Sequence, residues 1–233
     1  MLLNALRRAA IALLVGALVV ALVGIVMERA FLRRLPGQTL GQVLMTIGFA
    51  LIFQDVALLI WGGDPYSIRV PAQLSGVVTA GPGRFPIYRI FIIAVAVAVG
   101  AALWLVLDRT RIGAMIRAAV DDAEMAQGVG IRVPRVSLGV FALGAALAAF
   151  GGVVGAGFLG VYPGADFEVL PYAFVVIIVG GLGSLPGAMV GSLLVGLLDN
   201  FGKALFPELS YFTLFAPMAL ILALRPTGLF GRG

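Results

Sequence analysis

The sequence contains no cysteine and no histidine, and Lys203 is its only lysine. The first two absences exclude disulfides, thiol nucleophiles, Ser–His–Asp triads and metal sites with Cys or His ligands. No G-x-x-x-x-G-K-[ST] motif is present, since Ala204 follows the lysine, so a phosphate-binding loop of that type is excluded as well. We therefore expect no catalytic residue, no metal and no cofactor, and a protein that is not an enzyme.

Charged residues are also scarce. Only 12% of the 233 residues are charged, whereas 61% are hydrophobic. A soluble domain is about half apolar and about a quarter charged, so this composition predicts a membrane protein. The formal net charge of +5 then has a simpler use than binding nucleic acid, because an excess of arginine orients helices in a bilayer.

Six apolar segments predict an all-α fold, a polytopic transmembrane helical bundle within a single domain over residues 1–233. The first segment follows Arg7 and Arg8, as in a signal peptide, but no clear A-x-A cleavage site follows it, which favours a retained helix. The segment 62–86 is rich in Gly and Pro and predicts either a short hairpin or coil. The expected spans are residues 9–27, 40–61, 87–107, 136–159, 169–200 and 210–224.

The fifth span is interrupted by the sequence GGLGSLPG, Gly180 to Gly187. Glycine loosens a helix and Pro186 removes a backbone donor, which leaves halves of about 13 residues, short of the roughly 20 needed to cross. One interpretation is a broken, re-entrant helix pair beside a transport pathway. The other is an ordinary tight turn between two short helices.

We interpret Asp55, which follows Gln54, as the only acidic residue well inside an apolar run. An ionisable group in a membrane span is costly and is therefore a functional candidate, here for a translocation path. The alternative is that Asp55 lies near the helix end, close to Trp61, and reaches interfacial water. The sequence leaves both interpretations open.

The longest polar interval between apolar segments covers residues 108–135. Its apolar residues recur at helical spacing, and Asp121 or Asp122 can cap a second short helix that Gly128 ends. The interval is either a solvated loop on the membrane surface or a docking element for a soluble partner. Its arginines are Arg109, Arg111, Arg117, Arg132 and Arg135.

These arginines predict that the interval 108–135 is cytoplasmic. The segment 62–86 is then external, and Arg29, Arg33 and Arg34 lie inside as well. Arg7 and Arg8 fall outside, which the rule disfavours. An internal C-terminus requires that residues 169–200 enter and leave on the same face.

Three ordered motifs resemble one known family, the permeases of ABC importers for branched-chain amino acids. The run IRAAVDDAEMAQGVGI, Ile116 to Ile131, resembles their cytoplasmic coupling loop, with the pattern R-A-x-x-x-[DN]-x-x-x-A-x-x-x-G-[IV]. Gly180 to Gly187 resembles the segment G-G-x-G-[ST]-x-x-G, and Arg225 to Phe230 resembles the ending R-P-x-G-[LI]-F. The short tail is more similar to the high-affinity LivH type than to LivM.

The resemblance implies a multi-pass permease subunit in the bacterial inner membrane that pairs with a second permease subunit. Two ATP-binding cassette subunits would engage the coupling loop, and a periplasmic binding protein would deliver branched-chain amino acids or a related small solute. Gly180, Gly181, Gly183 and Gly187 would shape the broken helix near the path. The implied residues of the ATPase contact are Arg117, Asp121, Glu124, Ala126, Gly128 and Gly130.

The chain departs from this family at its beginning. Members usually start with further helices and an N-F-A-H-G-like stretch, which nothing here matches. We expect either that this N-terminal part is missing or that the chain is a diverged member. The alternative functions are a truncated or non-transporting structural subunit, and a membrane enzyme. The enzyme would need a cluster of polar groups at one membrane depth, which the sequence does not suggest.

Overall fold

The computed structural model describes residues 2–35, 37–68, 70–71, 74–80 and 83–231, which are mostly helical. Within them, five helical segments are long and apolar enough to cross a bilayer, which confirms an all-α polytopic membrane protein. The chain divides into two compact units, residues 1–163 and 164–233, and each is described by itself. The five segments are Ile11–Arg34, Thr39–Trp61, Ile87–Arg109, Val133–Leu159 and Leu185–Leu205.

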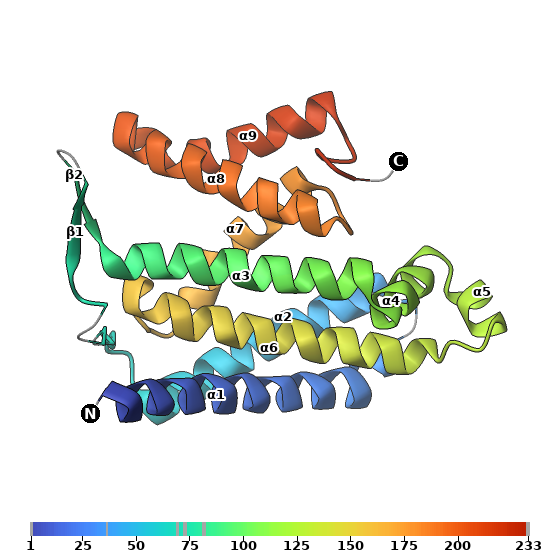
Figure 1. Ribbon diagram of the computed structural model, residues 1–233. Helices are drawn as coiled ribbons and strands as arrows, with labels where there is room; N and C mark the ends of the chain where they lie inside the picture. The colour runs from blue at the N-terminus through green and yellow to red at the C-terminus, as the bar shows by residue number, and fades with distance from the viewer. Residues whose placement is uncertain (1, 36, 69, 72–73, 81–82, 232–233) are drawn as a thin grey trace. The chain divides into compact units, whose positions relative to one another are not determined.

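The first unit is built on two long helices that lie side by side, α1 (Leu2–Ala30) and α6 (Val133–Leu159) (Figure 1). They run antiparallel, because Gly16 faces Val153 and Gly24 faces Ala145. A Cβ atom at Gly24 would lie 2.9 Å from that of Ala145, so the absence of a side chain permits the close approach. The other elements of this unit are η1 (Leu32–Arg34), α2 (Thr39–Trp61), β1 (Val77–Ala80), β2 (Gly83–Pro86), α3 (Ile87–Arg109), α4 (Arg111–Asp121) and α5 (Ala123–Gly128).

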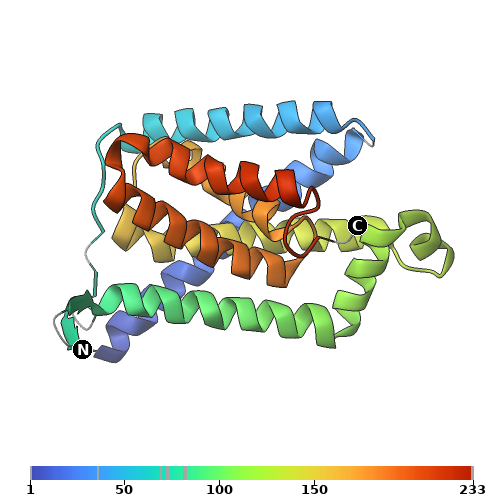
Figure 2. The same ribbon diagram turned by 90° about the horizontal axis from the view of Figure 1, so that it is seen from above.

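The segment between α2 and α3 forms a hairpin, which decides between the two interpretations of residues 62–86. β1 pairs antiparallel with β2, with Val78 opposite Phe85. The backbone of Tyr66 exchanges hydrogen bonds of 2.7 and 3.0 Å with Val161, just after α6. Figures 1 and 2 show the hairpin at one end of α3 and the short helices α4 and α5 at the other.

The first predicted span ends at residue 27, and the structure extends this helix further. α1 continues through Ala30, and Glu28 is buried, with 8% of its surface exposed. Its Oε2 atom has no hydrogen-bond partner within the described residues. Residues 32–34 then form η1, and the amide of Gln42 donates a 2.8 Å hydrogen bond to the Leu35 carbonyl, which fixes the turn into α2.

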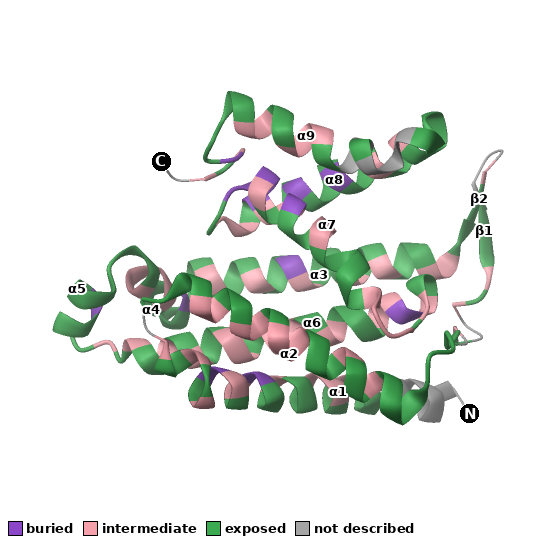
Figure 3. Cartoon of the chain, turned by 180° about the vertical axis from the view of Figure 1, so that it is seen from behind, coloured by how far each residue is buried: buried purple, intermediate pink, exposed green. Residues whose placement is uncertain are grey.

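The second unit contains α7 (Ala165–Gly180), α8 (Leu185–Leu205), η2 (Pro207–Leu209) and α9 (Ser210–Leu224). Its core is formed by Val175, Val179 and Val195, and its buried positions gather on α7 and α8 (Figure 3). The break between the two helices is confirmed, but the prediction that each half has only about 13 residues is wrong. α7 has 16 residues and α8 has 21, so α8 is long enough to cross a bilayer.

Candidate functional site

The turn from α3 into α4 is held by three local interactions. Thr110 caps α4, since its hydroxyl accepts a hydrogen bond from the Gly113 N–H at 3.3 Å. Gly113 is buried, and a Cβ atom there would overlap the Leu107 carbonyl. The Arg117 guanidinium donates to that carbonyl and lies 3.6 Å from the Asp108 carboxylate. Arg117, a predicted contact residue, therefore fastens α4 to the end of α3.

The second short helix forms as the sequence predicts. Asp122 is its cap, because its Oδ1 atom accepts hydrogen bonds from the N–H groups of Glu124 and Met125 at 3.0 and 2.9 Å. Asp121 is instead the last residue of α4. α5 ends at Gly128, as expected, and the Ile131 N–H then donates a 2.9 Å hydrogen bond to the Ala126 carbonyl. This bond links α5 to the short segment that leads into α6.

The exposed side chains at the end of α4, on α5 and directly after it form what we call the coupling surface, a name that refers to its predicted role. It consists of Val120, Asp121, Glu124, Met125 and Val129. Its three apolar members are 76%, 67% and 71% exposed, although they lie outside the candidate membrane spans. Large apolar side chains grouped on an exposed surface commonly mark an interaction site. Ala126 is only 3% exposed, so it lies beneath this surface rather than on it.

The glycines of the break allow α7 and α8 to meet closely. A Cβ atom at Gly180 would overlap the Gly187 carbonyl, and one at Gly187 would overlap the Gly180 carbonyl. The Ser184 hydroxyl caps α8 by accepting a 3.1 Å hydrogen bond from the Gly187 N–H. Close packing thus accounts for these two glycines and forms an ordered turn between two helices.

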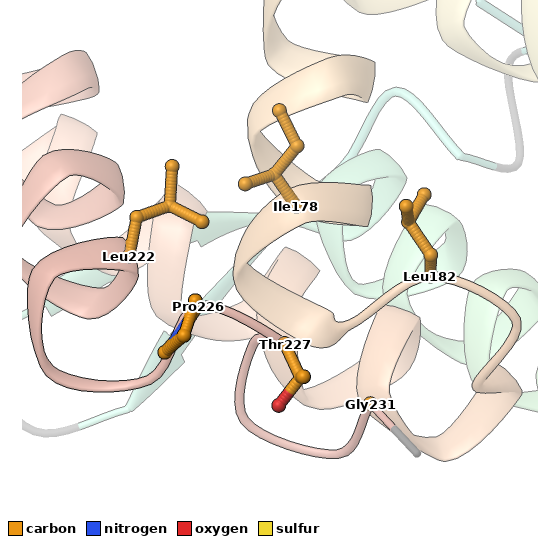
Figure 4. A pocket seen from close by; sticks show the side chains of 6 residues that line it. All are labelled: Ile178, Leu182, Leu222, Pro226, Thr227 and Gly231. Atoms are coloured by element: carbon orange, nitrogen blue, oxygen red, sulfur yellow. The ribbon is translucent and has the colours of Figure 1, made fainter. Parts of the chain in front are cut away.

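The end of the chain pairs with this turn. The Leu229 N–H donates to the Val179 carbonyl at 2.9 Å, and a Cβ atom at Gly228 would lie 2.6 Å from the Gly181 Cα. Two of the three motifs that suggested the family therefore meet in space. Beside them lies a hollow of about 390 Å³ (Figure 4), lined by Ile178, Leu182, Leu222, Pro226, Thr227 and Gly231.

Gln54 and Asp55 lie on α2, a helix on which no residue is buried. Asp55 is exposed and Gln54 is half-buried. They belong to the unit 1–163, whereas the glycines of the break belong to the unit 164–233. Their part in a translocation path stays a prediction.

Sequence reasoning missed a polar cluster in the second unit. The Lys203 ammonium donates hydrogen bonds to the Asp199 carboxylate at 2.8 Å and to the Tyr172 hydroxyl at 2.7 Å. It also lies 5.3 Å from the centre of the Tyr172 ring. The acid–base spacing of four residues along α8 was a usable signal. Asp55 is therefore not the only acidic residue inside an apolar helix, since Asp199 and Glu28 are others.

The fold and the coupling surface define a multi-pass α-helical membrane protein with a small group of helices outside the membrane spans. The family model described as the branched-chain amino acid transport system permease component matches residues 1–224, and the chain belongs to this family. It is a multi-pass protein of the bacterial inner membrane.

Individual relatives agree with this assignment. The chain is 32% identical over 217 residues to the high-affinity branched-chain amino acid transport system permease protein BraD of Pseudomonas aeruginosa, covering 90% of this chain and 70% of BraD. It is 38% identical over 133 residues to LivH of Escherichia coli (strain K12), covering 56% of this chain and 43% of LivH. It is 26% identical to the ribose import permease protein RbsC of the same organism, over 94% of this chain and 67% of RbsC. No solved structure matches the chain.

Proposed function

We propose that the chain is a pore-forming permease subunit of an ABC importer for branched-chain amino acids or a related small solute. Family membership and the relation to BraD and LivH support the class of solute. The chain has no phosphate-binding loop of its own, so the energy would come from two ATP-binding cassette subunits. A second permease subunit and a periplasmic binding protein would complete the importer.

The observation that carries this proposal is the coupling surface. It combines exposed apolar side chains with the carboxylates of Asp121 and Glu124. A docked partner would cover the apolar groups and place basic groups opposite the two acids. Gly128 and Gly130 flank the turn into α6 and would let the partner approach the backbone.

The contacts behind the surface explain how docking would act on the membrane helices. Arg117 fastens α4 to the last turn of α3, and the bond from Ile131 to Ala126 holds α5 against the segment that leads into α6. A displacement of the coupling surface on ATP binding or hydrolysis would therefore reach α3 directly and α6 through the segment that precedes it. In this proposal Ala126 acts through packing and not through contact with the ATPase.

The proposed path for the solute involves Gln54 and Asp55 on α2 and the glycines of the break, Gly180, Gly181, Gly183 and Gly187. A path lined by glycine backbone would pass a small solute with an apolar side chain. The wall formed by this chain would be completed by the second permease subunit.

The test is recovery of partners from native membranes in mild detergent, followed by mass spectrometry. We expect the tagged chain to bring down two ATP-binding subunits and a second permease subunit. Glu124→Arg should reduce recovery of the ATP-binding subunits about tenfold through charge reversal at the interface. Glu208→Arg is the matched control, because it makes the same charge change on the other unit, in η2.

Unchanged recovery with Glu124→Arg would contradict the coupling assignment. A structural subunit that does not transport would also bind partners, so uptake of labelled leucine must be measured with the complex in vesicles. Uptake that depends on ATP and on this chain supports the permease. Partner binding without uptake supports the structural alternative.

A further inference from the structure

A basic hollow lies at the end of the first unit where α5 and α6 meet η1. It has a volume of about 410 Å³, and three arginines line it, Arg33, Arg132 and Arg135. Arg33 comes from η1, and the other two come from the beginning of α6. The remaining lining residues are Gln127, Gly130, Ile131 and Pro134. Two distant parts of the chain, residues 33 and 127–135, therefore converge on one site.

The hollow has no counter-charge of its own. Its lining residues include no acid, and no described acidic side chain forms an ion pair with any of the three arginines. Like charges gathered in one place repel each other, and the N-terminus of α6 adds a partial positive charge there. An anion from outside the chain would remove this repulsion. Guanidinium groups match phosphate especially well, because they can donate two parallel hydrogen bonds.

The position of the hollow identifies the source of the anion. The first membrane span ends at Arg34, and the span of α6 begins at Val133, so the hollow lies where two spans meet the membrane surface. Lipid headgroups occupy this depth. The concentration of arginine at this end predicts that it is the cytoplasmic one, where basic pockets between helices bind anionic headgroups.

The coupling surface favours a lipid over an acidic partner protein. Asp121 and Glu124 make that neighbouring surface acidic, so a protein that docks on it would present basic groups, which the arginines would repel. We propose that Arg33, Arg132 and Arg135 form a binding site for the phosphate group of an anionic phospholipid of the inner leaflet. The lipid would join η1 and the start of α6 next to the coupling surface.

The experiment is native mass spectrometry of the purified, delipidated full chain, titrated with phosphatidylglycerol or with phosphatidylcholine of the same acyl chains. The wild-type chain should bind phosphatidylglycerol more tightly. The triple variant Arg33→Gln, Arg132→Gln, Arg135→Gln should lose roughly tenfold or more of this affinity, since each cation contributes near an anionic surface. The single variant Arg132→Gln should lose a smaller part of the affinity for phosphatidylglycerol. It provides the test if the triple variant does not fold.

The matched control is the triple variant Arg29→Gln, Arg34→Gln, Arg111→Gln. It removes the same charge from exposed arginines outside the lining of the hollow, in the last turn of α1, in η1 and at the start of α4. Its affinity for phosphatidylglycerol should stay within about threefold of the wild-type value. Equal losses in the two triple variants would show that only overall charge matters and would overturn the proposal.

Two further arms separate the sources of phosphate. Inorganic phosphate at millimolar concentration should displace little of the bound lipid. If phosphate binds the hollow as tightly as phosphatidylglycerol does, the lipid assignment is overturned. In membranes, the hollow triple variant should still recover the ATP-binding subunits. If it loses them while lipid binding is unchanged, the arginines belong to a protein interface and the proposal is wrong.

Discussion

The backbone N–H of Phe230 donates a 3.0 Å hydrogen bond to the carbonyl oxygen of Gly180, the last residue of α7. The last carbonyls of a helix have no partner within the helix, and here the end of the chain supplies one. The adjacent bond from Leu229 to Val179 extends the pairing. The turn between α7 and α8 is thus held by residues from three parts of the second unit.

Substitutions at two glycines of this turn should separate backbone strain from close contact. Gly181 and Gly183 both have positive φ, +99° and +79°. A Cβ atom at Gly181 would overlap the Gly231 backbone, whereas one at Gly183 meets nothing within 4 Å. Gly183→Ala should cost about 1–2 kcal/mol, the strain of the left-handed conformation, and Gly181→Ala should cost clearly more. Thermal unfolding in detergent measures both, and equal losses would contradict the pairing with the C-terminal segment.

The cluster of Tyr172, Asp199 and Lys203 should show strong coupling between its charged members. Lys203→Met leaves the carboxylate of Asp199, 15% exposed, without its 2.8 Å ion pair. We expect this variant to lower the free energy of unfolding by about 1 kcal/mol. This is less than the cost of breaking a fully buried ion pair, because Lys203 is partly exposed. The double variant with Asp199→Leu should be more stable than the sum of the single changes predicts. Additive losses in a double-mutant cycle of unfolding would show that the pair contributes nothing.

Glu28 should be a position where an apolar residue stabilises the protein. Its Oε2 atom is buried without a hydrogen-bond partner in the described part of the chain, and such groups are costly. Glu28→Met should therefore increase the free energy of unfolding by about 1–3 kcal/mol and raise the midpoint of thermal unfolding. Glu208→Met, at an exposed position, is the control and should change little. A lower midpoint for Glu28→Met would indicate that a partner subunit or lipid uses the carboxylate.

Asp122 should control the order of α5. Asp122→Ala removes the acceptor for two backbone N–H groups and should cost about 1 kcal/mol of local stability. Hydrogen exchange should then be faster in the segment 123–128. Asp121→Ala is a matched control, because Asp121 does not cap α5. The same exchange in both variants would contradict the capping role.

Local sequence signals predicted the local structure well. Apolar spacing and a cap at Asp121 or Asp122 predicted both short helices, and the structure selects Asp122. Glycine with Pro186 predicted the break. These features depend on residues close together in the chain. The true lengths of α7 and α8 were harder to predict, because Asp199 and Lys203 look like the end of a span until Tyr172 is known to join them.

Contacts between distant residues could not be read in the same way. The burial of Glu28 depends on its place on the long helix α1, and the basic hollow depends on Arg33 meeting residues 127–135. Both segments line that hollow, which is consistent with the prediction that they lie on one side of the membrane, and that prediction stays to be tested. The charge rule predicts on which side of the membrane these arginines lie, whereas the hollow that they line is visible only in the folded structure.

The pairing of Phe230 with Gly180 also constrains the depth in the membrane at which the turn between α7 and α8 can lie. Because the C-terminal segment is hydrogen-bonded to residues 179 and 180, we expect Arg225 and the turn to lie near the same face of the membrane, and the charge rule predicts the cytoplasmic one. With this orientation we expect α8 to cross the bilayer from that face, which would bring Lys203, in its last turn, to the periplasmic side. The only lysine in the sequence is then predicted to face outward, and its reaction with an amine-reactive probe that cannot cross membranes would test this orientation.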